Sequence, residues 1–558
     1  MKLNMSLSLR NTFYFFLGLI APMQALSQQT VGSFLNDTAS FDGYTLVSPL
    51  LSDSTYLIDN CGYKVKTWSS DYRPGFATYL LENGNLLRTA KIQSNIFSGG
   101  GTGGLIQEFN WEGDLVWDYQ FADKTKHQHH DIEPLPNGNH LILSWSFFSD
   151  QDALDHGKNP SDVQASFWPT LISEVQPIYP DSAIIVWEWN AWDHLIQDLD
   201  PAKPNYGVVA DHPELIDINQ PSLEHRDWLH CNSVKYNPNL DQIVMSSRNC
   251  NEIYVIDHST TWAEAGTHTG GNQGKGGDIL YRWGNPINYH HGTVDDQILF
   301  YPHDVHWIAD SLENGGKMFI FNNGGGVNGS AVELISTSVD QNGSYSFTPG
   351  TSYAPIAADW RFEASWLNSA HTSGAQRLPN GNTLICEGGD GNIFELNAED
   401  SIVWQYVNPA GGTGIVTQGN YPAQQTSLFR ATRYPASYPA FIGKDLSPIS
   451  RIELEPYPSD CEITAEPIDS AITGGIKESL AFDVKVNGLI SDVLSITVNT
   501  NDQYAVRVFD LTGRETNQMN VQNGLNSISA ENWPSGQYFL SITSRTNSTT
   551  QFYQVIKI

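Results

Sequence analysis

Histidines recur in this sequence directly before stretches that are typical of β-strands. The segments are HHD at residues 129–131, HCNS at residues 230–233 and HDV at residues 303–305. A neutral imidazole is both a nucleophile and a proton carrier near pH 7, and the Arg248 guanidinium, which follows the second segment, offers a planar set of donors for an anionic group. If the strands behind these segments converge, their side chains form a nucleophilic site for an anionic substrate.

The elements that would position these side chains are β-hairpins in a repeat. Asn-Gly pairs at residues 83–84, 137–138 and 380–381 lie between alternating apolar residues, which is a strong hairpin signal. A second strand pair follows in each copy and ends in an aromatic residue. The six copies of this pair end at Trp68, Trp117, Trp187, Trp283, Phe347 and Trp404. Two hairpins in each of six copies predict an all-β fold, a six-bladed β-propeller with four-stranded blades.

The two ends of the repeat array are expected to meet. Residues 45–47 and 429–434 each have the pattern of a single strand, and together they would complete one blade. In such a ring the innermost strand of every blade lines a central channel, so the residues just ahead of these strands point at a common centre.

Aligning the copies on their apolar positions brings the histidine segments and a Thr-Ser pair to this centre. The predicted site residues are His129, His130, His230, Asn232, Arg248, His303, Thr372 and Ser373. Hairpin geometry can return Arg248 toward His230, where its strand pair begins. Because His129 and His130 are adjacent in a strand, only one of them can face the centre squarely. The His-Asp-Ile/Val pattern that His130 shares with His303 favours His130, and the sequence leaves the choice open.

The composition limits the partners and cross-links. The chain has 558 residues and a formal net charge of −32, from 61 acidic and 29 basic side chains. Because no excess of lysine and arginine exists to neutralise phosphates, nucleic acid is excluded as a partner. An anionic substrate therefore needs a local positive cluster. Five cysteines are too few for a disulfide scaffold, and the sequence leaves open whether Cys231 and Cys250 are bridged.

Four regions follow from the pattern along the chain. Residues 1–27 have a basic start, an apolar core and a small-x-small end, as a secretory signal peptide does. Residues 28–446 form the predicted propeller, residues 447–485 an irregular linker, and residues 486–558 a run of short alternating strands that predicts a small β-sandwich. No later apolar run is long enough to span a bilayer, so we expect no transmembrane segment in the mature chain.

The strings HHDIEPLPNGNHLIL, WLHCNSVKYNPNLDQIVMSSR, PHDVHWI and FRATRYP carry a family resemblance over roughly residues 45–445. They resemble the bacterial arylsulfate sulfotransferases. The resemblance implies a six-bladed propeller that moves a sulfuryl group from a phenolic sulfate ester to an acceptor phenol, independently of the nucleotide sulfate donor PAPS and without a metal or other cofactor. It also implies a ping-pong mechanism through a sulfohistidine.

The same resemblance assigns roles to residues. It implies that His303 is the nucleophile that becomes transiently sulfated. It implies that His230, Asn232, Arg248 and one of His129 and His130 surround it. Pro302 departs from the family pattern, in which a polar residue precedes the His-Asp pair, and this departure affects the setting of the nucleophile.

The end of the chain has a second resemblance. The strings VRVFDLTGR, PSGQYFLSI and VIKI are similar to those of the C-terminal sorting domain of the type IX secretion system. This implies passage through the periplasm, export to the cell surface or the medium, and the type IX machinery as a partner. A carbohydrate-binding module is the alternative for this region.

Two other functions fit the histidine pattern. Imidazoles that converge in a channel can bind a divalent metal and activate water, as in a metal-dependent hydrolase or lyase, although Arg248 among them would repel a cation. A non-enzymatic propeller that binds a ligand at the cell surface is the other alternative. Tyr301, Trp307 and Trp366 are candidates to flank a phenol ring in the proposed site.

Overall fold

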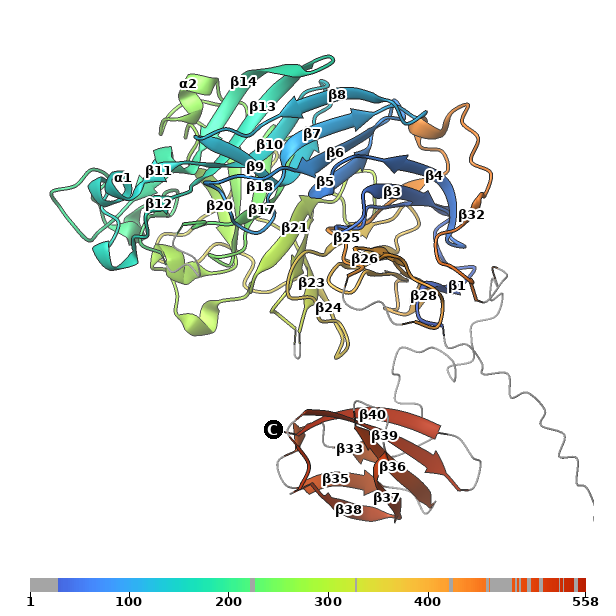
Figure 1. Ribbon diagram of the computed structural model, residues 1–558. Coiled ribbons are helices and arrows are strands. Elements are labelled where there is room, and N and C mark those ends of the chain that lie inside the picture. Colours follow the sequence, from blue (N-terminus) through green and yellow to red (C-terminus); the bar gives the residue numbers. More distant parts are fainter. Residues whose placement is uncertain are drawn as a thin grey trace, which may run out of the picture. The chain divides into compact units, whose positions relative to one another are not determined.

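The computed structural model describes residues 29–220, 226–326, 329–420, 425–457 and 461, and most of the residues from 484 to 557. The chain divides into two compact units, Met1–Thr464 and Ala465–Ile558. Nearly all regular structure in the described residues is β-strand (Figure 1). The predicted signal peptide and much of the predicted linker lie outside the described residues.

The first unit contains, in its described residues, six antiparallel sheets of four or five strands. Across the first sheet the strands are β31 (Thr432–Pro435), β2 (Gly43–Val47), β3 (Ser54–Ile58), β4 (Tyr63–Ser69) and β32 (Ser450–Arg451), and across the second they are β5 (Pro74–Leu80), β6 (Leu86–Lys91), β7 (Gly104–Phe109) and β8 (Leu115–Gln120). The third sheet has β9 (Lys126–Pro134), β10 (His140–Ser146), β13 (Thr170–Ile178) and β14 (Ser182–Asn190), and the fourth has β17 (Cys231–Asn237), β18 (Gln242–Ser247), β19 (Glu252–Asp257) and β20 (Ile279–Trp283). The fifth sheet has β21 (Pro302–Trp307), β22 (Met318–Asn322), β23 (Ala331–Ile335) and β24 (Trp360–Glu363), and the sixth has β25 (Gly374–Arg377), β26 (Thr383–Glu387), β27 (Asn392–Leu396), β28 (Ile402–Val407) and β1 (Gly32–Asn36).

The predicted Asn-Gly hairpins are confirmed. Gly84, Gly138 and Gly381 have φ values of 90°, 84° and 88° in the turns that join β5 to β6, β9 to β10 and β25 to β26. Glycine adopts this left-handed region without a steric penalty, so each turn sets the register of the strand pair behind it.

The tryptophans at the ends of the repeats join neighbouring sheets. In every sheet an indole N–H from the fourth strand donates a hydrogen bond to the next sheet, either in the connection between its third and fourth strands or, for Trp117, at the first residue of its fourth strand. The pairs are Trp68 to Asn110 O, Trp117 to Ser182 O, Trp187 to Thr260 Oγ1, Trp283 to Pro355 O, Trp360 to Asp400 Oδ1 and Trp404 to Asn60 O. The last of these bonds runs from the sheet of β28 back to the sheet of β2, so the order of contacts returns to its start.

The core follows the same order. Six apolar clusters in this unit each combine buried side chains of two neighbouring sheets. Trp404 of β28 and Tyr56 of β3, for example, share one cluster, although they are far apart in sequence. A long chain thus buries its apolar side chains in several small cores between sheets.

The ends of the first unit are fastened to each other. Strand β31 pairs with β2, as predicted for residues 429–434 and 45–47. Strand β1 also pairs with β28. Residues 450–451, which the sequence places in an irregular linker, form β32 and pair with β4. A disulfide joins Cys61 to Cys461, whereas Cys231 and Cys250 are free and buried.

The fifth sheet differs from the prediction at its outer edge. Its fourth strand is β24, which carries Trp360, and residues 345–347 are not part of it. Tyr345 instead stacks on Tyr281 of the preceding sheet, with ring centroids 4.9 Å apart. A long insertion between β23 and β24 separates the true outer strand from its hairpin, and aromatic residues within that insertion imitate its pattern.

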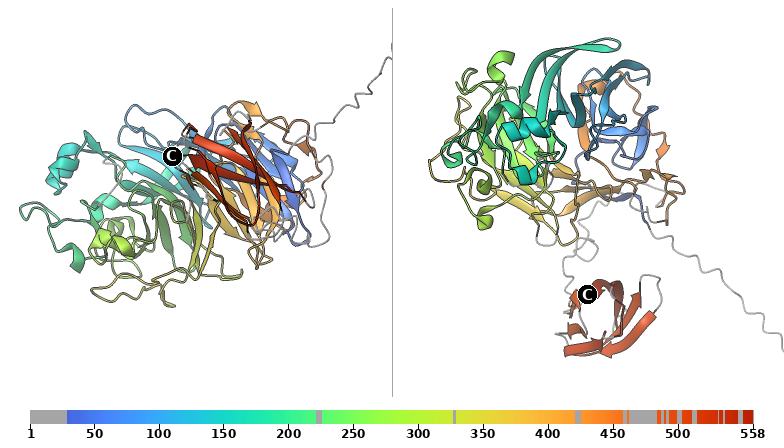
Figure 2. Two further views of the ribbon diagram at one scale, coloured as in Figure 1. Left: turned by 90° about the horizontal axis from the view of Figure 1, so that it is seen from below. Right: turned by 60° about the vertical axis from the view of Figure 1, so that its left-hand side comes forward.

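Short elements extend from the sheets of the first unit. They are the helices α1 (Asp150–Asp155) and α2 (Trp262–Ala265) and the strand pairs β11 (Phe148–Ser149) with β12 (Ser166–Phe167), β15 (Leu195–Ile196) with β16 (Ile216–Asp217), and β29 (Ala410–Gly411) with β30 (Gly414–Ile415). Figure 2 shows the helices at the periphery of this unit, in the cyan to green part of the chain. None of the described helices is both long and apolar enough to traverse a lipid bilayer.

The second unit consists of two small sheets around one apolar cluster. The strands are β33 (Val484–Val486), β35 (Val493–Val498) and β38 (Gly524–Ser529) in one sheet, and β34 (Leu489–Ile490), β40 (Thr550–Lys557), β39 (Gly536–Ser544), β36 (Tyr504–Asp510) and β37 (Glu515–Val521) in the other. Leu494 and Ile496 from the first sheet pack with Val506 and Leu540 from the second. Each sheet therefore buries one face against the other.

Candidate active site

The first strands of five sheets contact one another in turn, β5 with β9, β9 with β17, β17 with β21 and β21 with β25, and an unusual backbone conformation lies in or just before each of them. Positive φ values occur at Phe76 (98°), His130 (50°), His230 (45°), Asp304 (51°) and Thr372 (60°). At Phe76, His130 and Asp304 the strand also shifts register against its partner, and in β17 the shift lies just after His230, between Cys231 and Ser233. Such a bulge redirects a side chain out of the strand's alternation, at a cost of order 1 kcal/mol per residue. The repeated bulge therefore aims the histidines away from the ordinary faces of their sheets.

His303 is buried at the head of β21, and both of its ring nitrogens have partners. The N–H of Thr372 donates to Nε2 at 3.1 Å, and Nδ1 lies 2.7 Å from Asn323 Oδ1. Because Nε2 accepts a hydrogen bond, the ring proton lies on Nδ1 and Nδ1–H donates to Asn323. Burial lowers the pKa of His303 to about 3, and the nearby charge of Arg248 acts in the same direction. The imidazole is thus neutral, with its lone pair on Nε2.

His130 and His129 have different surroundings. The ring of His130 lies 4.8 Å from that of His230, between centroids, whereas His129 stacks on Trp145 at 4.1 Å. Their Nδ1 atoms are 2.9 Å apart, so one ring donates a hydrogen bond to the other. Burial lowers the pKa of both rings, that of His129 to about 3. His130 is therefore the member of the pair that meets the other histidine segments, and His129 supports it from behind.

His230 is held by a carboxylate that the sequence did not suggest. Its Nδ1–H donates to Asp227 Oδ2 at 2.5 Å, and Asp227 Oδ1 accepts the indole N–H of Trp145 at 2.6 Å. Burial raises the pKa of the Asp227 carboxyl, but the charge and hydrogen bond of His230 outweigh this and lower it. A Cβ atom at Gly100 would lie 3.3 Å from His230 Cε1, so the loop passes directly over this ring.

Arg248 follows β18 and lines a pocket of about 480 Å³. Its backbone N–H donates to the carbonyl of His230, which confirms that the strand pair returns to its start. The guanidinium lies over the ring of Tyr301, 5.1 Å from the centroid. The other lining residues are Asn323, Gly324, Gly326, Gly329, Asn368 and Ala370. The glycines leave room beside a single positive charge, which suits a ligand with an anionic group.

The remaining predicted residues have mainly backbone and hydroxyl contacts. Asn232 donates to the carbonyl of Pro302 at 2.9 Å and accepts a hydrogen bond from Ser246, so its side chain fixes β21 rather than lining the pocket. Thr372 supplies the N–H that meets His303, and the hydroxyl of Ser373 bonds to that of Ser369 at 2.9 Å. Trp307 and Trp366 pack in the apolar clusters between sheets, whereas Tyr301 lines the pocket.

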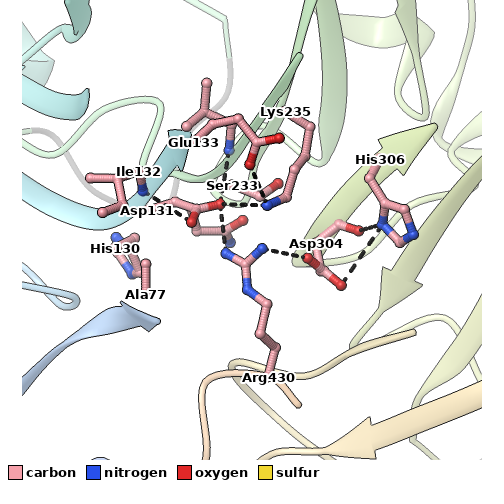
Figure 3. Close-up of polar contacts among 12 residues, drawn as sticks. Ala77, His130, Asp131, Ile132, Glu133, Ser233, Lys235, Asp304, His306 and Arg430 are labelled. Atoms are coloured by element: carbon pink, nitrogen blue, oxygen red, sulfur yellow. Dashed lines mark hydrogen bonds and ion pairs between the residues drawn. The ribbon is translucent and has the colours of Figure 1, made fainter. Parts of the chain in front are cut away.

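Arg430 forms ion pairs with the aspartates of two of the histidine segments (Figure 3). Its Nη2 lies 2.6 Å from Asp131 Oδ2, and its Nη1 lies 2.9 Å from Asp304 Oδ1. Asp131 follows His130 in the chain, and Asp304 follows His303. Burial raises the pKa of the Asp131 carboxyl, but the charges of Arg430 and Lys235, together with hydrogen bonds from Arg430 and the Val234 N–H, outweigh this and hold it below the ordinary value. One buried guanidinium therefore fixes the backbone of both segments.

Comparison with known proteins gives the family. The family described as arylsulfotransferase (ASST) matches residues 47–411, and the secretion system C-terminal sorting domain matches residues 490–557. The chain belongs to the arylsulfotransferase family. Membership supports an arylsulfotransferase-type function, and the type IX sorting domain suggests export to the cell surface or the medium. No curated protein matches the chain.

Solved structures similar to this arylsulfotransferase-family chain are distant. A putative 6-phosphogluconolactonase from Bacteroides fragilis is 11% identical, covers 71% of this chain and 99% of its own, and has a TM-score of 0.35. A periplasmic gluconolactonase from Pseudomonas aeruginosa is 10% identical over 87% of this chain and 99% of its own, with a TM-score of 0.32. Virginiamycin B lyase from Staphylococcus aureus is 11% identical over 68% and 88%, with a TM-score of 0.32.

Three residues of the candidate site did not emerge from the sequence. Asp227 lies three residues before His230, and a search for a carboxylate near each histidine would have found it. Arg430 lies in the string FRATRYP, but its partners are remote in the chain. Asn323 is one of several asparagines in a glycine-rich loop, and nothing in its spacing distinguishes it.

Proposed function

We propose that the first unit is a closed six-bladed β-propeller that transfers a sulfuryl group from a phenolic sulfate ester to an acceptor phenol, independently of PAPS. Six sheets whose tryptophans bond each sheet to the next, and the last to the first, support the closed ring. The observation that carries the reaction is the position of His303: a neutral, buried imidazole within the electrostatic influence of Arg248.

In the first half-reaction Nε2 of His303 attacks the sulfur of the donor ester. The N–S bond forms as the S–O bond to the phenol breaks, and the electron pair leaves on the phenolate oxygen. Nδ1–H keeps its hydrogen bond to Asn323, which stabilises the positive charge that develops on the ring. Once the Nε2 lone pair is used, the N–H of Thr372 becomes free to donate to a sulfuryl oxygen.

Arg248 supplies the charge that the transferred group requires. The sulfuryl group carries negative charge on three oxygens, and a guanidinium offers donors in a fixed plane. In a chain of net charge −32, this cluster is the local exception that attracts an anionic ester. The pocket of about 480 Å³ next to Arg248 has room for a phenol ring beside Tyr301.

His230 is the proposed proton carrier. Asp227 binds its Nδ1–H and fixes the ring, so Nε2 exchanges the proton. A proton carried on Nε2 of His230, while Nδ1–H stays with Asp227, passes to the departing phenolate. In the second half-reaction Nε2 takes the proton of the acceptor phenol as that oxygen attacks sulfur and the N–S bond breaks. The donor product leaves before the acceptor reacts, and the kinetics are therefore ping-pong. His130 lies against His230, and His129 holds His130 in place.

The proposed role of the second unit is to direct the export of the enzyme. A type IX sorting domain directs a chain that has reached the periplasm to the cell surface or the medium. The predicted signal peptide would provide the first step of that route. The phenolic donor and acceptor are then met outside the cell, where nucleotide donors are scarce.

Incubation with a chromogenic nitrophenyl sulfate tests the proposal. Without an acceptor we expect a covalent sulfuryl adduct by intact-mass measurement, and added phenol should discharge it and restore turnover. His303→Ala should lose both the adduct and the release of nitrophenol. The matched control is His212→Ala, which should keep both, because His212 is an exposed histidine paired with Glu214. Release of nitrophenol that persists in His303→Ala would overturn the proposal. Release that is abolished by a chelator would favour the metal-dependent hydrolase instead.

A further inference from the structure

A glycine-rich loop of the sheet that contains β20 lies against a buried histidine that follows the last strand of the preceding sheet. The loop, GTHTGGNQGKGGD at residues 266–278, joins α2 to β20 and contains His268 near its start and Asp278 at its end. His194 follows β14 of the preceding sheet and is fully buried. None of these three residues contributes to the reaction proposed above.

His194 is held rigidly in one orientation. Its ring stacks on Trp189 at a centroid distance of 5.6 Å and an interplanar angle of 7°. Its Nε2 lies 2.8 Å from the carbonyl oxygen of Ala265, and its Nδ1 lies 2.8 Å from Asp278 Oδ1. His268 brings its own Nδ1 to the same carboxylate oxygen, also at 2.8 Å. Three donor atoms that metals bind therefore converge, all within 4.8 Å of one another.

The protons of His194 do not satisfy both of its contacts in the neutral form. A neutral imidazole has one N–H, and both nitrogens of His194 face an oxygen that only accepts. If Nε2–H donates to Ala265, Nδ1 directs a lone pair at a carboxylate. A divalent cation bound by both Nδ1 and Asp278, which would move apart from their 2.8 Å separation to receive it, removes this conflict without adding a proton to a fully buried ring.

We infer that His194, His268 and Asp278 bind a divalent metal ion of the Zn²⁺ class. Two imidazole nitrogens and one carboxylate oxygen are a ligand set that Zn²⁺ favours, with bonds of about 2.0–2.2 Å. The carbonyl of Ala265 would fix the tautomer of His194 through the other ring nitrogen, as partners behind metal ligands do. His268 is exposed, so a small rotation of its side chain closes the ligand set and leaves one position open to water.

The ion would fasten both ends of the glycine-rich loop to the preceding sheet. His268 and Asp278 are ten residues apart in the loop, and His194 ends the 3-10 turn Ala191–His194, which follows β14 of the preceding sheet. Gly277 has no room for a side chain, because a Cβ atom there would lie 2.1 Å from the Ala265 carbonyl. The site is structural in this arrangement, and it is separate from the pocket beside Arg248.

Zinc titration of the full chain tests the inference. After treatment with a chelator and dialysis, the chain is incubated with Zn²⁺, passed through gel filtration and measured for bound metal and for Tm. We expect the wild-type chain to hold one more equivalent than His268→Ala and to gain Tm on zinc addition, because an ion that binds only the folded state stabilises it. The control His212→Ala should behave as wild type, since His212 is also exposed and paired with a carboxylate.

Two further variants separate this site from the catalytic histidines. Asp278→Asn should lose the same equivalent as His268→Ala, and His303→Ala should retain it. Substitution of Co²⁺ should give visible absorption bands in the wild-type chain that His268→Ala lacks. Equal zinc content and equal Tm shifts in wild type and His268→Ala would overturn the inference, as would loss of the ion in His303→Ala alone.

Discussion

Arg430 and Asp304 form a buried ion pair in which Nη1 lies 2.9 Å from Oδ1, and Asp304 directly follows the proposed nucleophile His303. The same guanidinium binds Asp131, which directly follows His130. Two strands therefore repeat the same His-Asp pair, in which the histidine belongs to the proposed site and the aspartate binds Arg430. A bulge makes this possible, because φ is positive at His130 and at Asp304.

Arg430 is a positioning residue, and its removal should affect both stability and activity. Arg430→Gln leaves Asp131 and Asp304 buried without a counter-charge, so we expect a loss of about 3–5 kcal/mol in the free energy of unfolding. Arg430→Lys should lose less, because it keeps the charge but not the two-pronged geometry. Urea denaturation measures the stability, and the adduct yield of the folded protein measures the positioning of His303.

The control for this prediction is Lys317→Gln. Lys317 pairs with the carboxylate of Asp359, and both side chains are about one-third exposed. Its loss should cost no more than about 1 kcal/mol and should leave the adduct yield unchanged. If the two variants lost similar stability, or if Arg430→Gln formed the adduct at the wild-type rate, Arg430 would have no role in positioning.

The pH dependence of adduct formation reports on Asn323. Because the pKa of His303 is about 3, the wild-type nucleophile stays neutral and its adduct rate should not fall between about pH 7 and pH 5 on account of His303. Asn323→Asp places a carboxylate beside Nδ1, which stabilises the imidazolium and raises the pKa of His303. The rate in this variant should therefore fall at a higher pH than in wild type, as measured by single-turnover mass spectrometry. Superimposable pH profiles would contradict the assignment of Asn323.

The sequence predicted the strands better than the positions of the side chains. The turn at an Asn-Gly pair and the strand that ends in a tryptophan are set by residues nearby in the chain, so both can be recognised in the sequence. The bonds from one tryptophan to the next sheet connect residues that are far apart, as Trp404 and Asn60 are. Trp360 was missed because a long insertion separates it from its hairpin, and Phe347 took its place in the prediction.

The site illustrates the same limit. The alternation of a strand left His129 and His130 undecided, because a bulge overrides alternation and its positive φ has no fixed sequence signal outside glycine. Asn232 has the residue type of a ligand for an anion, yet its amide bonds to Pro302 and Ser246 inside the fold. Residue type and spacing indicated the chemistry, and only the three-dimensional contacts separated the residues that touch the pocket from those that hold them.

The cysteines give a prediction that does not depend on function. We expect a peptide cross-link between Cys61 and Cys461 in the non-reduced chain and three free thiols, Cys231, Cys250 and Cys386. Burial raises the pKa of all three thiols, so a thiol reagent should count none of them in the folded chain and all three after denaturation. Reduction should lower Tm, since the bond closes a long loop. Peptide mapping that links Cys231 to Cys250 would contradict the structure.

His140 should make the chain sensitive to acid. Its ring nitrogens are buried without a hydrogen-bond partner among the described residues, and burial lowers its pKa to about 4. The unfolded chain takes up the proton near pH 6.5 and the folded chain does not, so stability falls as the pH drops from about 6.5 to about 4. His140→Leu removes this group, and its free energy of unfolding should vary less with pH in that range. An unchanged pH slope would show that His140 is protonated in the fold.

His258 should have the opposite effect on the alkaline side. Burial lowers its pKa, but hydrogen bonds to Asp241 and Glu174, each within 2.9 Å, outweigh this and raise the pKa to about 9. The stabilisation is fully present below about pH 6.5 and is lost as the pH rises through about 9, with a magnitude on the order of 3 kcal/mol. In His258→Gln the free energy of unfolding, measured by urea denaturation between these values, should lose this decline. The contrast with His140→Leu provides the control, because the two variants change opposite limbs of one pH profile. A variant that altered both limbs equally would indicate a general loss of packing and not the removal of a proton-linked ion pair.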